Sequence, residues 1–74
     1  MPLVSREDSV LVVVDAQPGF VAAEEAAAHA LERIAWMAGL AALLDVPAVV
    51  VEEGPQRNGH TDPLILERVP AARR

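Results

Sequence analysis

In the stretch VLVVVDAQPGF, residues Val10 to Phe20, an unbroken series of apolar residues is followed directly by an aspartate and then by a Pro-Gly pair, which is typical of a turn. An apolar run without alternation is typical of a strand covered on both faces, as in parallel sheets. A second run, Ala48–Val51, ends at an acidic Glu-Glu-Gly sequence. We therefore predict two buried parallel strands, at about 10–14 and 48–51.

The segment between these runs predicts a helix from about Glu24 to Leu44, because Ala, Leu, Glu, Arg and Met dominate it. Asp45-Val46-Pro47 ends this helix, since the residue before a proline avoids helical geometry. A strand, a helix and a second strand form a βαβ unit. The predicted fold class is therefore α/β, with a parallel-sheet βαβ unit at its centre.

The rest of the chain predicts less regular structure. Gly54 to Thr61 is expected to be a long polar loop. A short helix follows, because Asp62 can cap it and Pro63 suits its first position. Val69-Pro70 is expected to stop this helix.

The predicted long helix poses a burial problem. Its second half, Ile34–Leu44, carries no charge on any face, and a helix that is apolar all round is normally buried on all sides. Two strands cannot supply that burial, so we expect additional protein to cover it. Alternatively, Ala and Gly dilute the run and leave its outer face weakly apolar. Trp36 is interpreted as packing or a subunit contact rather than as a platform for a ligand.

Composition excludes several classes of protein. The chain has 74 residues, a net charge of −5 and no Cys, so it lacks both a disulfide and the basic patch of a nucleic-acid-binding protein. Arg73-Arg74 is read as a solvated tail or a cut end. Charges at residues 6–8 interrupt any signal peptide, and no uncharged run reaches the roughly twenty residues that span a bilayer. We expect a cytoplasmic protein without a membrane partner.

Asp15 is the first candidate for chemistry. Ligands of open parallel sheets bind beyond the carboxyl ends of the strands, where Asp15 follows the first strand and Glu52 and Glu53 follow the second. A carboxylate there is suited to act as a general base or to orient a partner. Equally, Asp15 could accept hydrogen bonds from the backbone around Pro18-Gly19 and simply cap a turn.

These residues resemble the opening strand of the isochorismatase-like cysteine hydrolases, the superfamily that includes nicotinamidases. That pattern is a hydrophobic strand, Asp, any residue, Gln, and an aromatic three residues on, and Asp15, Gln17 and Phe20 match it. The segment LLDVPAVVVEEGPQRNGHTDPLILERVP, with its Gly-x-Thr-x-Pro sequence, is similar to the second strand and following loop of family members. The resemblance covers nearly the whole chain.

The resemblance implies a three-layer α/β/α Rossmann-like fold of which residues 1–74 form the N-terminal, apparently truncated portion. It implies an Asp, Lys and Cys triad with a Cys nucleophile, and Asp15 falls on the Asp position. The sequence contains neither Lys nor Cys. Gln17, Phe20 and Glu53 become candidates for lining or supporting a substrate pocket.

Some family members hold a metal through an Asp and two His. Here the corresponding region offers only His60, so we predict no metal, no cofactor, and a relationship to the metal-free branch, which acts on vinyl-ether or amide substrates. Arg57 and Asn58 could reach an anionic substrate, although an ordinary exposed loop is the favoured interpretation.

Three hypotheses follow. The first is an isochorismatase-like hydrolase acting on a small molecule, in which the remainder of the domain or another subunit completes the site around Asp15. The second is a degenerate, non-catalytic chain that acts as an oligomerisation module. The third is a small domain for an anionic ligand, which is disfavoured because Ala16-Gln17-Pro18-Gly19 lacks the spacing of a Gly-rich phosphate loop.

Overall fold

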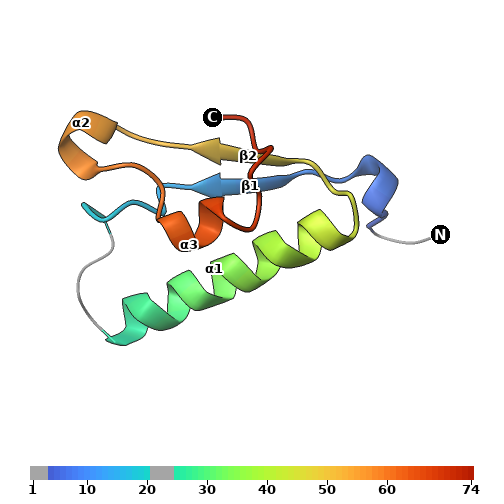
Figure 1. The fold of residues 1–74 in the computed structure, drawn as a ribbon, viewed down its shortest axis with the longest axis horizontal. Coiled ribbons are helices and arrows are strands. Elements are labelled where there is room, and N and C mark those ends of the chain that lie inside the picture. Colours follow the sequence, from blue (N-terminus) through green and yellow to red (C-terminus); the bar gives the residue numbers. More distant parts are fainter. Residues whose placement is uncertain (1–3, 21–24) are drawn as a thin grey trace.

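The computed structural model describes residues 4–20 and 25–74. The elements, in chain order, are η1 (Arg6–Asp8), β1 (Leu11–Val14), α1 (Glu25–Leu43), β2 (Ala48–Val51), α2 (Pro55–Asn58) and α3 (Pro63–Leu66). Figure 1 shows both strands pointing in the same direction, with α1 running beneath them and α2 beyond the end of β2.

The predicted βαβ unit is confirmed. Both strands and α1 lie within two residues of their predicted bounds, and Glu24, where the helix was expected to begin, lies outside the described residues. Asp45, just after α1, has a positive φ of 59° and reverses the chain into Pro47. The fold is therefore a mixed α/β unit with two parallel strands.

The segment after β2 corrects one prediction. Gly54–Thr61 was expected to be a loop, but Pro55–Asn58 forms α2, a single helical turn. Gly54 adopts a left-handed conformation with φ of 49°, and Pro55 occupies the first helical turn. α3 follows as predicted, because the side chain of Asp62 accepts a hydrogen bond of 2.9 Å from the backbone N–H of Leu64.

Backbone pairing continues beyond β2 but, among the described residues, not beyond β1. β1 and β2 pair in parallel, with Leu11 opposite Ala48 and Val14 opposite Val51. On the far side of β2, Arg73 forms a parallel bridge, because its backbone N–H donates to the Ala48 carbonyl at 3.1 Å. The reading of Arg73 as a solvated tail is therefore wrong for its backbone. No strand of the described chain pairs with the free edge of β1.

The described residues cover only one face of this sheet. Val13 and Val50 are buried and pack in one cluster with Ala38 of α1 and Ile65 of α3. Because side chains alternate across a strand, the neighbouring valines point to the other face, where Val14 is 62% exposed. From the unbroken apolar runs we predicted that both faces of the sheet would be covered. In the structure, the described residues cover one face.

α1 shows the same imbalance. Ala35, Ala38 and Ala41 are buried, whereas Trp36 and Leu43 are 63% and 79% exposed. Besides the partly buried Leu31 and Ile34, small residues therefore make up the inner face of the helix. Large apolar residues also lie on the outer face, so dilution by Ala and Gly does not explain the pattern. The whole chain exposes 5533 Å², against about 4400 Å² for a compact monomer of this mass.

No helix in the described part of the chain is long and apolar enough to cross a membrane.

Candidate functional site

Asp15 ends β1 in an unusual backbone conformation. Its backbone N–H donates to the Val51 carbonyl at 3.0 Å, which continues the ladder between the strands by one residue. Its φ is then 54°, in the left-handed region that few residues other than Gly adopt. Aspartate is one of the exceptions, and such conformations concentrate at functional sites.

The carboxylate of Asp15 has no hydrogen-bond or ion-pair partner among the described residues, although the residue is only half exposed. The expected turn-capping role is not seen. The N–H of Gly19 donates to the Asn58 carbonyl at 2.8 Å, and that of Phe20 donates to the Gln17 carbonyl at 3.0 Å. The turn is therefore held by other acceptors, and no described residue binds the Asp15 carboxylate.

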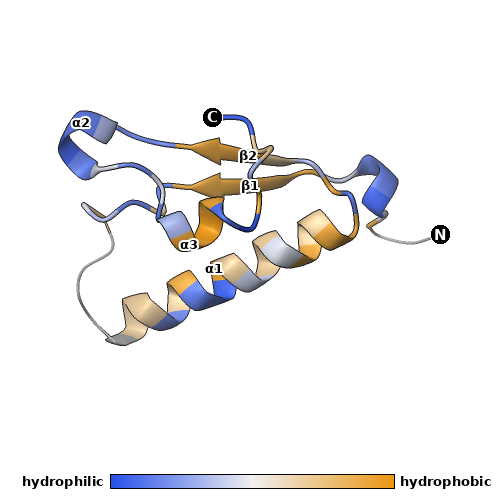
Figure 2. Cartoon of the chain, viewed as in Figure 1, coloured by the Kyte–Doolittle hydropathy of each residue, from blue (hydrophilic) through white to orange (hydrophobic). Residues whose placement is uncertain are grey.

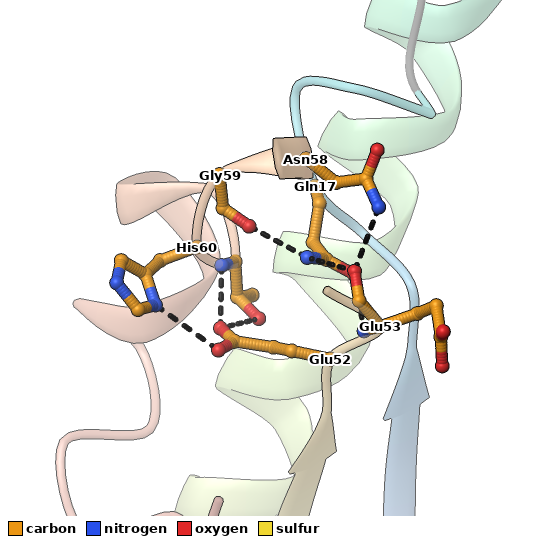
Figure 3. Close-up of polar contacts among 7 residues, drawn as sticks. Gln17, Glu52, Glu53, Asn58, Gly59 and His60 are labelled. Carbon is orange, nitrogen blue, oxygen red and sulfur yellow. Dashed lines mark hydrogen bonds and ion pairs between the residues drawn. The ribbon is translucent and has the colours of Figure 1, made fainter. Parts of the chain in front are cut away.

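Gln17 lies two residues further on and is fully buried. Its Nε2 donates to the Gly59 carbonyl at 2.6 Å and to the Glu53 carbonyl at 3.2 Å, and its Oε1 accepts from the Glu53 N–H at 2.9 Å. Figure 3 shows this amide reaching the chain on both sides of α2. Gln17 therefore supports the site by tying the turn after β1 to the segment after β2, and its amide is occupied by backbone groups.

Asn58 reinforces this connection. Its Nδ2 donates to the Glu53 carbonyl at 2.8 Å, and its backbone lies so close to Gly19 that a Cβ there would meet the Asn58 Cα at 2.7 Å. Gly19 is thus required by close approach of two backbones. These hydrogen bonds on both sides of α2 explain why a four-residue helix persists.

Glu52 is the inward-facing acid at the end of β2. Its side chain is 10% exposed, and its Oε2 accepts from the backbone N–H of Thr61 at 2.6 Å and from the Thr61 hydroxyl at 2.7 Å. The backbone hydrogen bond from Thr61, then its hydroxyl, then His60, lower the pKa of Glu52 from 4.5 to about 2. Glu52 is therefore an ionised structural anchor for the start of α3.

His60 was expected to be solvated, and it is 66% exposed. Its Nδ1 nevertheless lies 3.1 Å from Oε1 of Glu52. No group of three or more potential metal ligands occurs among the described residues.

The remaining candidates lie at the surface. The side chain of Glu53 is exposed and borders a polar concavity of about 350 Å³ with Arg57 and residues of α2. Phe20 is also exposed. The structure thus brings Gln17 to the backbone of Glu53, but among the described residues no hydrogen bond joins the Asp15 carboxylate to another candidate side chain.

Sequence reasoning passed over Glu52 in favour of Glu53. One signal pointed to Glu52: it lies two residues after buried Val50 and therefore on the same side of the strand. Because the valines before Glu52 are all apolar, the sequence does not show which of them face the core, and the side on which Glu52 lies was not recognised.

The site and fold together define a small α/β unit with two parallel strands and, where β1 ends, a carboxylate that no described residue binds. Comparisons with protein-family models, with curated proteins and with solved structures found no match. The resemblance to the isochorismatase-like hydrolases therefore rests on the residues of this chain.

Proposed function

We propose that this chain supplies the aspartate of an isochorismatase-like hydrolase site, whose Cys and Lys come from polypeptide outside these residues. The observation that supports the proposal most directly is the Asp15 carboxylate, which is held at the carboxyl end of a parallel strand and is bound by no described residue. A carboxylate that only stabilised the turn would accept hydrogen bonds there, as Glu52 does at the neighbouring strand end.

In the proposed reaction on a small amide, Asp15 accepts the proton of the cysteine thiol, and the resulting thiolate attacks the carbonyl carbon. Asp15 then returns the proton to the amine as the C–N bond breaks, which leaves a thioester on the cysteine. Water hydrolyses this thioester, with Asp15 taking the proton of the water, and the acid product and the free thiol are released. On a vinyl ether, Asp15 would instead protonate the methylene carbon, water would add to the carbon that bears the ether oxygen, and the ether C–O bond would then break.

The left-handed backbone at Asp15 and the Gln17 connection fix the position of this carboxylate. Phe20 and Glu53 are proposed to border the substrate from the turn after β1 and from the end of β2.

A second candidate function is that of a non-catalytic association module. The exposed valine face and the exposed outer side of α1 favour it, because large apolar patches mark interaction surfaces. Sedimentation of the natural protein, combined with a thiol-reactive probe, separates the two functions. A stable oligomer of this chain without any thiol-bearing polypeptide favours the module.

The enzymatic proposal is tested in the natural protein or complex that contains this chain and hydrolyses a small amide or vinyl ether. Asp15→Asn is expected to lower kcat by about 10²–10⁴-fold, because it removes the proton acceptor. Glu53→Gln is the matched control at the neighbouring strand end and is expected to affect KM more than kcat. Unchanged kcat in Asp15→Asn would refute the role of Asp15.

A further inference from the structure

Asn58 is the single asparagine of the chain, and Gly59 follows it. An Asn-Gly pair is chemically labile, because the backbone nitrogen of a glycine is not shielded by a side chain and can reach the side-chain carbonyl carbon of the asparagine before it. Gly59 has a φ of 79°, and a Cβ there would lie 3.1 Å from Pro18. The structure therefore requires a glycine after Asn58, and Asn58 itself is only partly buried.

We propose that Asn58 is a deamidation site whose reaction is controlled by the opening of α2. The backbone nitrogen of Gly59 loses its proton and forms a bond with Cγ of Asn58, while the bond between Cγ and Nδ2 breaks and the nitrogen leaves as ammonia. The cyclic succinimide that results takes up a water molecule at either of its carbonyl carbons. The product carries aspartate or isoaspartate in place of Asn58, with water consumed and ammonia released.

Hydrogen bonds restrain both reacting groups in the folded chain. The backbone N–H of Gly59 donates to the Pro55 carbonyl at 2.9 Å at the end of α2. The nitrogen that must leave, Nδ2 of Asn58, donates to the Glu53 carbonyl at 2.8 Å (Figure 3). The first bond must break before the Gly59 nitrogen can lose its proton, and the second before the Asn58 side chain can turn toward it. Deamidation therefore requires α2 to open.

α2 is held closed by few contacts. It is a single turn of four residues, none of which is buried, and Figure 2 shows it among the hydrophilic segments of the chain. Gln17 binds the flanking residues Glu53 and Gly59 rather than the turn itself. Elements with few buried contacts open far more often than a protein unfolds as a whole. Opening of α2 alone is thus the expected route to the reaction.

Neither product restores the closed arrangement. An aspartate in place of Asn58 lacks the Nδ2 donor and sets carboxylate oxygens against the Glu53 carbonyl. Isoaspartate adds a methylene group to the main chain where the backbones are already close, since a Cβ on Gly19 would meet the Asn58 Cα at 2.7 Å. Deamidation should therefore loosen the segment after β2 from the turn after β1, and the change is permanent because ammonia has left.

The first test measures deamidation in the protein that contains this chain, both folded and unfolded in urea, at mildly alkaline pH. The tryptic peptide 58–68 contains no other side-chain amide, so its gain in mass reports Asn58 alone, and chromatography separates the aspartate and isoaspartate products. Conversion should be at least about tenfold slower in the folded protein, because only the open population reacts.

Gly54→Ala tests whether α2 controls the rate. Gly54 precedes α2 with a φ of 49°, which alanine adopts only under strain, so the open population should rise and the folded protein should deamidate about 5- to 30-fold faster. Gly39→Ala is the matched control, because a Cβ on this residue of α1 would meet only the Arg68 side chain, at 3.6 Å. Its rate should be unchanged.

The effect of the product is tested by Asn58→Asp. Loss of the Nδ2 hydrogen bond should make hydrogen exchange at the Gly59 N–H about tenfold faster. Gln56→Glu adds the same charge to an exposed residue of α2 and should leave the exchange of Gly59 unchanged. None of these measurements depends on hydrolysis, so their outcome is separate from that of the proposed function.

Four results would overturn the proposal. They are an unfolded protein without conversion at Asn58, equal rates in the folded and unfolded protein, equal rates in Gly54→Ala and Gly39→Ala, and unchanged exchange of Gly59 in Asn58→Asp. Circular dichroism confirms that each variant is folded. If Gly54→Ala does not fold, Pro55→Ala replaces it as a milder variant, and its rate should rise about 2- to 5-fold because the first turn of α2 loses its fixed φ.

Discussion

The carboxylates that follow the two neighbouring strands, Asp15 and Glu52, differ in their hydrogen bonding. Glu52, after β2, accepts two hydrogen bonds from Thr61 and lies beside His60, and these contacts lower its pKa to about 2. Asp15, after β1, is held in a left-handed conformation and binds none of the described residues. The contrast teaches that position beyond a parallel strand is not enough to identify a functional acid. The hydrogen bonds of Glu52 stabilise the fold, whereas Asp15, which no described residue binds, is the acid that we propose for chemistry.

Gln17 connects these two strand ends, and its replacement should have the largest effect on folding. Gln17→Leu keeps the size of the side chain but leaves the Glu53 N–H and the Gly59 carbonyl without their partner. Each unsatisfied buried group costs about 1–3 kcal/mol, so we expect the free energy of unfolding to fall by about 3 kcal/mol. Urea denaturation followed by circular dichroism measures the change.

Glu53→Ala is the control for Gln17→Leu. It removes an exposed side chain whose backbone groups alone contact Gln17, and it should change stability by less than about 0.5 kcal/mol. Equal losses in the two variants would show that the buried amide does not hold the strand ends together.

How far the sequence predicts this arrangement depends on the range of the interactions. Both strands, α1 and the Asp62 cap of α3 follow from local patterns and are confirmed. α2 was missed, because one helical turn depends on distant bonds from Gln17 and on the left-handed Gly54 rather than on its own propensity. Free and saturated carboxylates were indistinguishable for the same reason: Thr61 reaches Glu52 only once the chain has folded.

The second-largest expected effect on stability concerns Glu52 and should appear when the pH is lowered. The pKa of Glu52 is lowered from 4.5 to about 2, so its stabilising effect is complete above pH 4.5 and is lost as the pH falls toward about 2. Glu52→Gln removes the charge and should cost about 1–3 kcal/mol at neutral pH, the usual range for hydrogen bonds to a charged group. Urea midpoints measured from pH 7 to pH 2 test both statements.

In Glu52→Gln the loss of stability between pH 4.5 and 2 should be smaller than in the unaltered chain. An identical pH profile in the two proteins would mean that other carboxylates govern acid unfolding. Asp15→Asn is the comparison variant here, since its carboxylate has no described partner to lose.

The smallest effect on folding is expected at Asp15 itself. Asn adopts positive φ about as readily as Asp, and no described hydrogen bond depends on the carboxylate. Asp15→Asn should therefore change the free energy of unfolding by less than about 0.5 kcal/mol. Asp15→Val should cost about 1–2 kcal/mol, because a β-branched residue resists the left-handed conformation, and urea denaturation compares the two variants.

This pair separates the shape of the backbone from the chemistry of the side chain. If Asn costs as much as Val, the carboxylate has a structural partner and Asp15 resembles Glu52. If Asn folds normally, loss of hydrolysis in the complete protein must arise from the missing proton acceptor rather than from misfolding. Only a measured loss of hydrolysis in that folded variant would support the proposed catalytic role of the end of β1, with Glu52 at the end of β2 stabilising the fold.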